Sequence, residues 1–354
     1  MRRLTLLSVI VMAAALGAAT VRVPRAVTLA YADRVYPSLQ SVLTPLSNRT
    51  SLPLFDLVVL ALGAGLVVAV VVAVRQAWKR RRFAPLLRVT LLVLTAVSLG
   101  YLWFLVAWGE NYRRPGVESS LEDFRPGRVT PGAVRALAER AVVEANRLHA
   151  PAHGHGFPEI DDAPADLAAA LHGVERALGR PTPTVFAVPK RPLTAPYMRA
   201  VGVSGMLAPL FLETYLNPDL TGPERPYVLA HEWAHLSGFA PEEDASFVGV
   251  LAALQADVAS QYSVWLFLVS EAAGQLQPVT RQLVLAALAE GPRRDLEAIE
   301  ARLRSRIAWL DRASWVAYDR AIKSQGAEAG VAGYGRVVQL LLGSGVLDRA
   351  RATS

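Results

Sequence analysis

His231-Glu232-Trp233-Ala234-His235 is the stretch from which the rest of this 354-residue chain is interpreted. On a helix, residues four apart share a face, so both imidazoles can reach one metal ion. Glu232, beside the first histidine, is placed to activate a water molecule on that ion. The alternative is a pair of hydrogen-bonded core histidines. Because the chain has only six histidines, this spacing favours a zinc hydrolase.

The flanking residues agree with a helix that ends soon after the motif. Pro226 suits the first turn, where its missing N–H costs nothing, and Gly238 suits a helix end at which the chain turns back. The acidic run Glu242-Glu243-Asp244 follows closely enough for one carboxylate to complete a set of three ligands. Cysteine is absent from the chain, so the predicted Zn²⁺ site uses histidine and carboxylate ligands alone.

Three apolar stretches are long enough to be considered as transmembrane helices, at about 4–20, 54–74 and 89–108. The first is shorter and ends in small residues, which leaves a signal peptide as the alternative to a retained helix. A retained helix is favoured because no clear cleavage pattern is present. Residues 1–108 are thus predicted to form a membrane region and 109–354 a separate domain.

Basic residues predict the orientation of these helices. The loop between the second and third stretches, 75–88, carries six Lys and Arg residues and no acidic residue, and short basic loops stay in the cytoplasm. The domain after Trp108 is therefore expected outside the cytoplasm. The net charge of +7 is explained by anionic lipid headgroups, and no nucleic-acid-binding pattern is present.

The pattern after the membrane region predicts a mainly α-helical domain with a small sheet. Strands are expected at 184–188 and 200–203, and the stretch 198–204 is the candidate edge strand for pairing with an extended peptide. Helices are expected at 130–148, 164–178, 245–273, 293–309 and 334–346. His149, His153 and His155 are expected in a solvated loop and not in a second metal site.

The segment His231–Phe247, HEWAHLSGFAPEEDASF, resembles a family of uncharacterised bacterial membrane proteins. These proteins have three amino-terminal spans and an HExxHxxGF motif followed by an acidic segment. The segments 108–113, 261–263 and 333–338 fit the same family, so the resemblance covers nearly the whole chain. It implies a membrane-tethered, gluzincin-like zinc metallopeptidase of the bacterial cytoplasmic membrane, with a zincin-like α+β domain.

The resemblance also implies roles for individual residues. Glu242 aligns with the third zinc ligand of such enzymes, with Glu243 or Asp244 as the alternatives. Ser246 stands where an aspartate or asparagine normally orients a histidine. The catalytic set then comprises Glu232 as the general base and, as donors to the developing oxyanion, three residues of the family-like segments: Tyr262, Tyr334 and Arg336.

The expected function is hydrolysis of peptide bonds in an extracytoplasmic protein or peptide by metal-activated water. The alternative is a non-catalytic zincin-fold receptor or assembly factor that retains a metal site, although Glu232 argues against a purely structural site. An intramembrane protease is excluded because polar residues bracket the motif at 223–227 and 242–244. The expected partners are the lipid bilayer and a peptide substrate, and the sequence leaves the oligomeric state open.

Overall fold

The computed structural model describes residues 2–20, 23–180, 182–307, 309, 310, 312, 314, 316 and 336–348. The first helices are α1 (Arg2–Thr20), α2 (Arg25–Ala30), α3 (Tyr36–Ser47), α4 (Leu54–Arg80), α5 (Ala84–Ala107), α6 (Pro131–His155) and α7 (Ala165–Ala177). The others are α8 (Ala195–Ala200), α9 (Arg225–Leu236), α10 (Glu242–Ala253), α11 (Val258–Gly274), α12 (Pro278–Ala286), α13 (Glu290–Arg304) and α15 (Val337–Ser344). Strands β1 (Gly205–Ala208) and β2 (Glu213–Leu216) form an antiparallel pair. The predicted fold class, mainly helical with a small sheet, is confirmed in this part of the chain.

Short helical turns complete the elements. A π-helical turn covers Tyr31–Val35, and 3₁₀ turns cover Gly109–Arg113, Val117–Ser120, Pro126–Arg128 and Gly222–Glu224.

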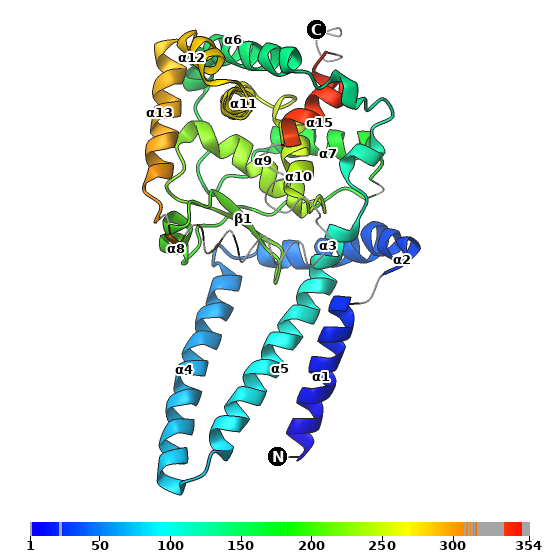
Figure 1. The fold of residues 1–354 in the computed structure, drawn as a ribbon, viewed down its shortest axis with the longest axis vertical. Helices are drawn as coiled ribbons and strands as arrows, with labels where there is room; N and C mark the ends of the chain where they lie inside the picture. The colour runs from blue at the N-terminus through cyan, green and yellow to red at the C-terminus, as the bar shows by residue number, and fades with distance from the viewer. Residues whose placement is uncertain are drawn as a thin grey trace.

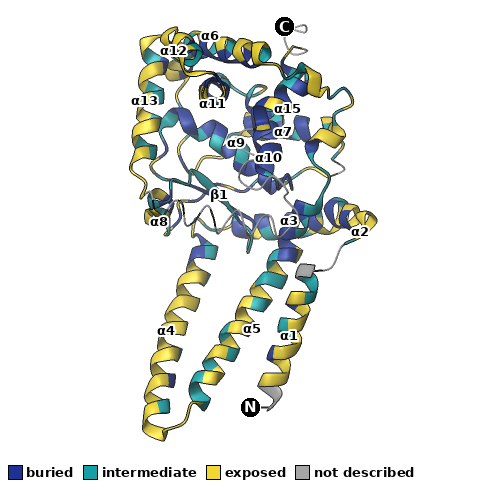
Figure 2. Cartoon of the chain, viewed as in Figure 1, coloured by how far each residue is buried: buried dark blue, intermediate teal, exposed yellow. Residues whose placement is uncertain are grey.

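Two helices, α4 and α5, are long and apolar enough to cross a membrane. They contain most of the predicted second and third stretches, and with α1 they project from one side of the domain (Figure 1). Most of their apolar side chains are exposed (Figure 2), as expected for surfaces that face lipid. The apolar part of α1, Thr5–Ala18, is shorter. It packs against α5, where Thr95 Oγ1 donates a hydrogen bond to Ser8 Oγ over 2.8 Å.

The core of the domain lies around α9, α10 and α11 (Figure 2). Trp233, inside the HExxH motif, is fully buried, and its ring stacks on Phe186 at 4.6 Å between centroids. Its indole Nε1 donates to Ala187 O over 2.9 Å. Trp233 is therefore a core residue that anchors α9 from the face opposite the histidines.

The segment between α1 and α4 lies at the base of the domain (Figure 1). Tyr36 of α3 is buried, and its hydroxyl donates to Leu236 O, at the end of α9, over 2.7 Å. Tyr31 and Trp108 belong to the same apolar core. Although 25–47 precedes the predicted boundary at residue 108, it packs into the core of the following domain.

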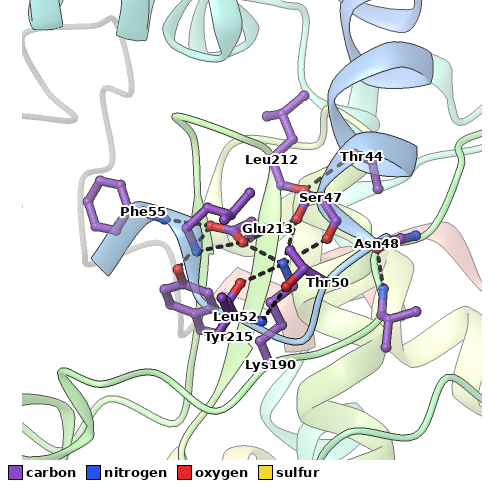
Figure 3. A network of polar contacts seen from close by, with 12 residues as sticks. Thr44, Ser47, Asn48, Thr50, Leu52, Phe55, Lys190, Leu212, Glu213 and Tyr215 are labelled. Carbon is purple, nitrogen blue, oxygen red and sulfur yellow. Dashed lines mark hydrogen bonds and ion pairs between the residues drawn. The ribbon is translucent and has the colours of Figure 1, made fainter. Parts of the chain in front are cut away.

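A buried ion pair attaches α4 to the sheet (Figure 3). Lys190 Nζ lies 2.7 Å from Glu213 Oε1 and also donates to Ser47 O over 2.9 Å. The Glu213 carboxylate accepts from the backbone N–H groups of Leu54 and Phe55 over 3.1 and 2.8 Å. Because the first N–H groups of a helix lack intrahelical partners, Glu213 caps α4 where it meets the domain.

The predicted strand at 184–188 is wrong: the segment has no regular secondary structure and pairs with no strand in the described part of the chain. Side chains of α3 and of its C-cap residue, Asn48, take the place of a partner strand. Asn48 Oδ1 accepts from Val188 N over 2.9 Å, and Asn48 Nδ2 donates to Phe186 O over 3.0 Å. Gln40 binds both backbone groups of Val185. The local pattern could not distinguish these side-chain partners from a neighbouring strand.

The predicted strand at 200–203 is also wrong. Ala200 ends α8, and Gly202, at φ +70°, reverses the chain before β1 begins at Gly205. The predicted edge strand at 198–204 thus covers the end of α8 and the turn, and the strand itself begins after it, at Gly205. The strand that follows it, β1, does contact α9.

Two helix predictions need correction. Helix α6 begins as expected, with Thr130 accepting from Ala133 N, but it continues to His155. His149, His153 and His155 therefore lie on a helix and not in a loop. Pro151 removes only one helical hydrogen bond, and Leu148 and Ala152 remain buried against the core. The single helix expected at 245–273 is divided in two, because Asp257 caps a new helix at Ser260 N over 2.7 Å.

Candidate metal centre

The HExxH motif lies on α9 as predicted, with Pro226 in the first turn. Gly238, at φ +83°, then reverses the chain so that α10 packs back against α9. The two helices approach closely at Gly249, where a Cβ atom would lie 3.1 Å from His231 N. The sequence thus brings the first turn of α10 to the histidine face of α9.

Three side chains converge at this crossing: His231, His235 and Glu242. The Nε2 atoms of the two histidines lie 3.3 and 3.4 Å from the same carboxylate oxygen, Glu242 Oε2. Two ligand atoms about 2.1 Å from a tetrahedral zinc ion are separated by about 3.4 Å. The spacing of the cluster therefore fits a zinc ion of that geometry.

The other ring nitrogens are held by the protein. His235 Nδ1 lies 2.9 Å from Phe239 O, and His231 Nδ1 lies 3.3 Å from Ser246 Oγ. Because a carbonyl oxygen only accepts hydrogen bonds, His235 Nδ1 carries the proton. In the neutral ring, Nε2 then presents a lone pair toward the Glu242 carboxylate, an arrangement that a proton or a metal ion between the two atoms would stabilise.

The pKa values of the cluster reflect the same close approach of the rings and the carboxylate. Burial alone would raise the pKa of Glu242, but the His235 and His231 imidazoles hold it well below its usual range. Burial lowers the pKa of His235, yet the neighbouring Glu242 raises it to about 9. Both shifts favour a positive charge between the ring and the carboxylate.

The other two acids of the predicted run point elsewhere. Glu243 Oε1 pairs with Arg336 Nη1 over 3.4 Å, and Asp244 Oδ2 accepts from Val117 N over 3.0 Å. Of the three carboxylates, Glu242 is the one brought to the two histidines.

Glu232 lies beside the cluster against β1. It is 5% exposed and hydrogen-bonds to the backbone of Leu207. Burial raises the pKa of Glu232 to about 8, with His235 acting against the rise. Gly205 makes room for this side chain, because a Cβ atom there would lie 2.6 Å from Glu232 Oε1.

A cavity of about 410 Å³ opens onto His231 and Glu232. It lies between α9, α11 and α13, and most of its lining is apolar. The apolar lining residues include Val203, Tyr227, Leu266, Phe267, Leu296 and Ile299. Such a cavity can receive an apolar group of a few carbon atoms next to the two site residues.

Comparison with known protein families gives one match. The model of a family described as "Protein of unknown function (DUF3810)" matches residues 31–342. The chain belongs to this family. No curated protein and no solved structure matches the chain.

Of the three predicted oxyanion donors, Tyr262 and Arg336 do not line the cavity. The Tyr262 hydroxyl donates to Asp295 Oδ2 over 2.6 Å, in a separate cluster with His149 and His153. Arg336 pairs with Glu243, and Tyr334 lies outside the described residues.

Sequence reasoning missed the cavity and Gly205. The lining residues come from helices that are far apart in the chain, and no local pattern joins them. A lone glycine ahead of a short strand carries no signal that distinguishes a close approach from an ordinary turn.

Proposed function

We propose that this chain is a membrane-anchored, zinc-dependent peptidase of the zincin type. The observation that carries the proposal is the convergence of two imidazole Nε2 atoms on one carboxylate oxygen of Glu242. A second glutamate, Glu232, lies at the mouth of an apolar cavity beside that cluster. Two neutral histidines and a carboxylate, with a further position open, are the donor set of hydrolytic zinc sites.

The residues divide into ligands and a proton carrier. His231, His235 and Glu242 would hold the ion, with Ser246 and the Phe239 carbonyl fixing the two rings. Zinc bound there would supply Lewis acidity toward a water molecule and the scissile carbonyl. Glu232 would accept the proton of the attacking water and return it to the leaving amine. No other ionisable side chain is required for the proton transfer.

The substrate is proposed to be a peptide in an extended conformation. Strand β1 pairs with β2 along one edge, and the Leu207 backbone on β1 contacts Glu232. A peptide lying along β1 would therefore pass the site with its backbone antiparallel or parallel to a strand. The adjacent apolar cavity would then accept a side chain such as Leu, Ile or Phe next to the scissile bond.

The membrane arrangement is proposed to include α1 as a third span, since it packs along α5. The basic residues at the α4–α5 end, Lys79 and Arg80 in the last turn of α4 and Arg81 and Arg82 after it, would remain in the cytoplasm. The domain lies at the opposite end of α4 and α5 (Figure 1), so the site would face the outside of a bacterial cytoplasmic membrane.

The test is hydrolysis of a mixture of fluorogenic peptides by the full chain in detergent, supplied with Zn²⁺. Cleavage that is abolished by a chelator and by Glu232→Gln, with the fold intact, is the expected result. Zinc binding without cleavage of any peptide would instead favour the non-catalytic receptor.

A further inference from the structure

A second set of potential metal ligands lies on the opposite side of α11 from α9. It comprises His149 and His153 of α6 and Asp295 of α13. One ligand atom from each of the three lies within 4.8 Å of the other two. His153 Nε2 lies 2.9 Å and His149 Nε2 lies 3.8 Å from the same oxygen, Asp295 Oδ2. The first is a hydrogen-bond distance, and the two lie on either side of the separation of about 3.4 Å expected between ligands of a tetrahedral zinc ion.

Helical geometry places the two rings together. His149 and His153 are four residues apart, so they share one face of α6, and their ring centroids lie 4.3 Å apart. The neighbouring helix leaves room for them at Gly291, where a Cβ atom would lie 2.5 Å from His149 Nε2. Glycine in a helix costs about 1 kcal/mol relative to alanine, and the position of the His149 ring explains why it is tolerated here.

The carboxylate of this cluster is oriented by a buried side chain. The Tyr262 hydroxyl donates to Asp295 Oδ2 over 2.6 Å, and the Tyr262 ring packs edge-on against both histidines. Carboxylates that bind metals are commonly held by such hydrogen bonds. The Asp295 side chain is 17% exposed and those of His149 and His153 are 28% and 41% exposed, so an ion can enter from solvent.

We propose that His149, His153 and Asp295 form a second metal site, for a divalent transition ion such as Zn²⁺. Two imidazoles and one carboxylate are ligands that zinc and its neighbours in the first transition row share. This site is independent of the HExxH centre, because it uses none of its residues and lies on other helices.

The site would fix the outer wall of the cavity. Leu296 and Ile299, which follow Asp295 within about one turn of α13, line the cavity. The other end of α13 is held by the buried ion pair between Arg302 and Glu224, which precedes α9. A metal ion that joins Asp295 to α6 would hold the first half of α13 in the same way.

The test is the zinc content of the full chain in detergent, stripped with a chelator, re-equilibrated with Zn²⁺ and desalted. Wild type should hold one zinc ion per chain more than His149→Gln/His153→Gln. The control is His155→Gln, on the same helix, because His155 pairs with Asp257 and not with the cluster. It should hold as much zinc as wild type, whereas equal zinc in wild type and the double variant would overturn the proposal.

The Glu242→Ala background separates this site from the HExxH centre. In that background, Co²⁺ should still give visible absorption bands from nitrogen and oxygen ligands, and His149→Gln/His153→Gln should remove them. Bands that persist in the combined variant would contradict the site. Gly291→Ala should weaken the site while keeping its three ligands, because the added methyl group displaces the His149 ring. It should raise the Kd for Zn²⁺ about tenfold or more.

Discussion

Two of the buried carboxylates in the domain, Glu213 and Glu242, differ in what surrounds them. Glu213 accepts hydrogen bonds from donors on all sides: the Lys190 ammonium, two backbone N–H groups, and the hydroxyls of Ser47 and Tyr215 (Figure 3). Glu242 instead faces two imidazole nitrogens, whose partner Nδ1 atoms are already held by protein groups. The Glu213 network is filled with donors, as a structural network is, whereas the Glu242 cluster has the set of ligand atoms that we propose holds a cation.

The largest effect is expected from Glu232, the acid beside the Glu242 cluster. Glu232→Gln should lower peptide hydrolysis at least a hundredfold, because a general base contributes about 10²–10⁴ to the rate. Zinc content should stay at the wild-type value and the fold should stay intact, since Glu232 is not one of the proposed ligands. Parallel assays of cleavage and bound zinc check this, and substantial cleavage by the variant would contradict the role of Glu232.

The Lys190 and Glu213 pair should respond to mutation as a saturated structural network does. Lys190→Met leaves the Glu213 carboxylate buried without its cation, and such a loss costs about 3–5 kcal/mol of unfolding free energy. The double variant Lys190→Met/Glu213→Gln should recover part of that loss, because no charge then remains buried. Denaturant unfolding in detergent measures both, and a single variant as stable as wild type would show that the pair is not structural.

Added zinc should stabilise the chain through the Glu242 cluster and not through the Lys190 network. In a His153→Gln chain, in which the second metal site is disabled, zinc at a hundred times its Kd should add about 2.7 kcal/mol of stability through the HExxH centre. The shift in thermal midpoint is the measurement, and it should vanish in His153→Gln/Glu242→Ala. The Lys190 network contains no metal ligands. Adding Lys190→Met to the His153→Gln chain should therefore leave the zinc-induced shift in thermal midpoint unchanged.

The smallest effect concerns Glu271, which lines the cavity, and whose pKa burial raises to about 7 from 4.5. Since the pKa is higher in the folded state, folding stability is lost as the pH rises from about 4.5 through 7. Glu271→Gln should therefore stabilise the fold by about 1–2 kcal/mol at pH 8, after allowance for partial exposure, and by little near pH 4.5. Thermal midpoints across this range test it, and an equal gain at both ends would contradict the burial of the charge.

The parts of the site that sequence reasoning predicted are close together in the chain. His231, Glu232 and His235 lie on one helix, and the turn at Gly238 brings Glu242 back within a few residues. The spacing of the motif and the turn residues is therefore enough to place them. The long apolar stretches of α4 and α5 were likewise recognisable, since their length and composition are local properties.

The features that the sequence did not predict depend on partners far away in the chain. The segment 184–188 lacks a partner strand because Gln40 and Asn48, about 140 residues earlier, satisfy its backbone. His149 and His153 meet Asp295 only because α6 and α13 lie side by side. Pro151 and Gly154, which favour a turn locally, are overridden by the packing of α6 on α11.

The most direct test of the cation site at the end of α9 is the zinc content of Glu242→Ala compared with that of Glu243→Ala. The two variants remove neighbouring carboxylates, but the Glu243 side chain points to Arg336 and away from the histidines. Glu242→Ala should bind one zinc ion per chain fewer than Glu243→Ala, measured by elemental analysis on folded, desalted protein. Equal zinc in the two variants would contradict the assignment of Glu242 as a ligand and the metal centre that rests on it.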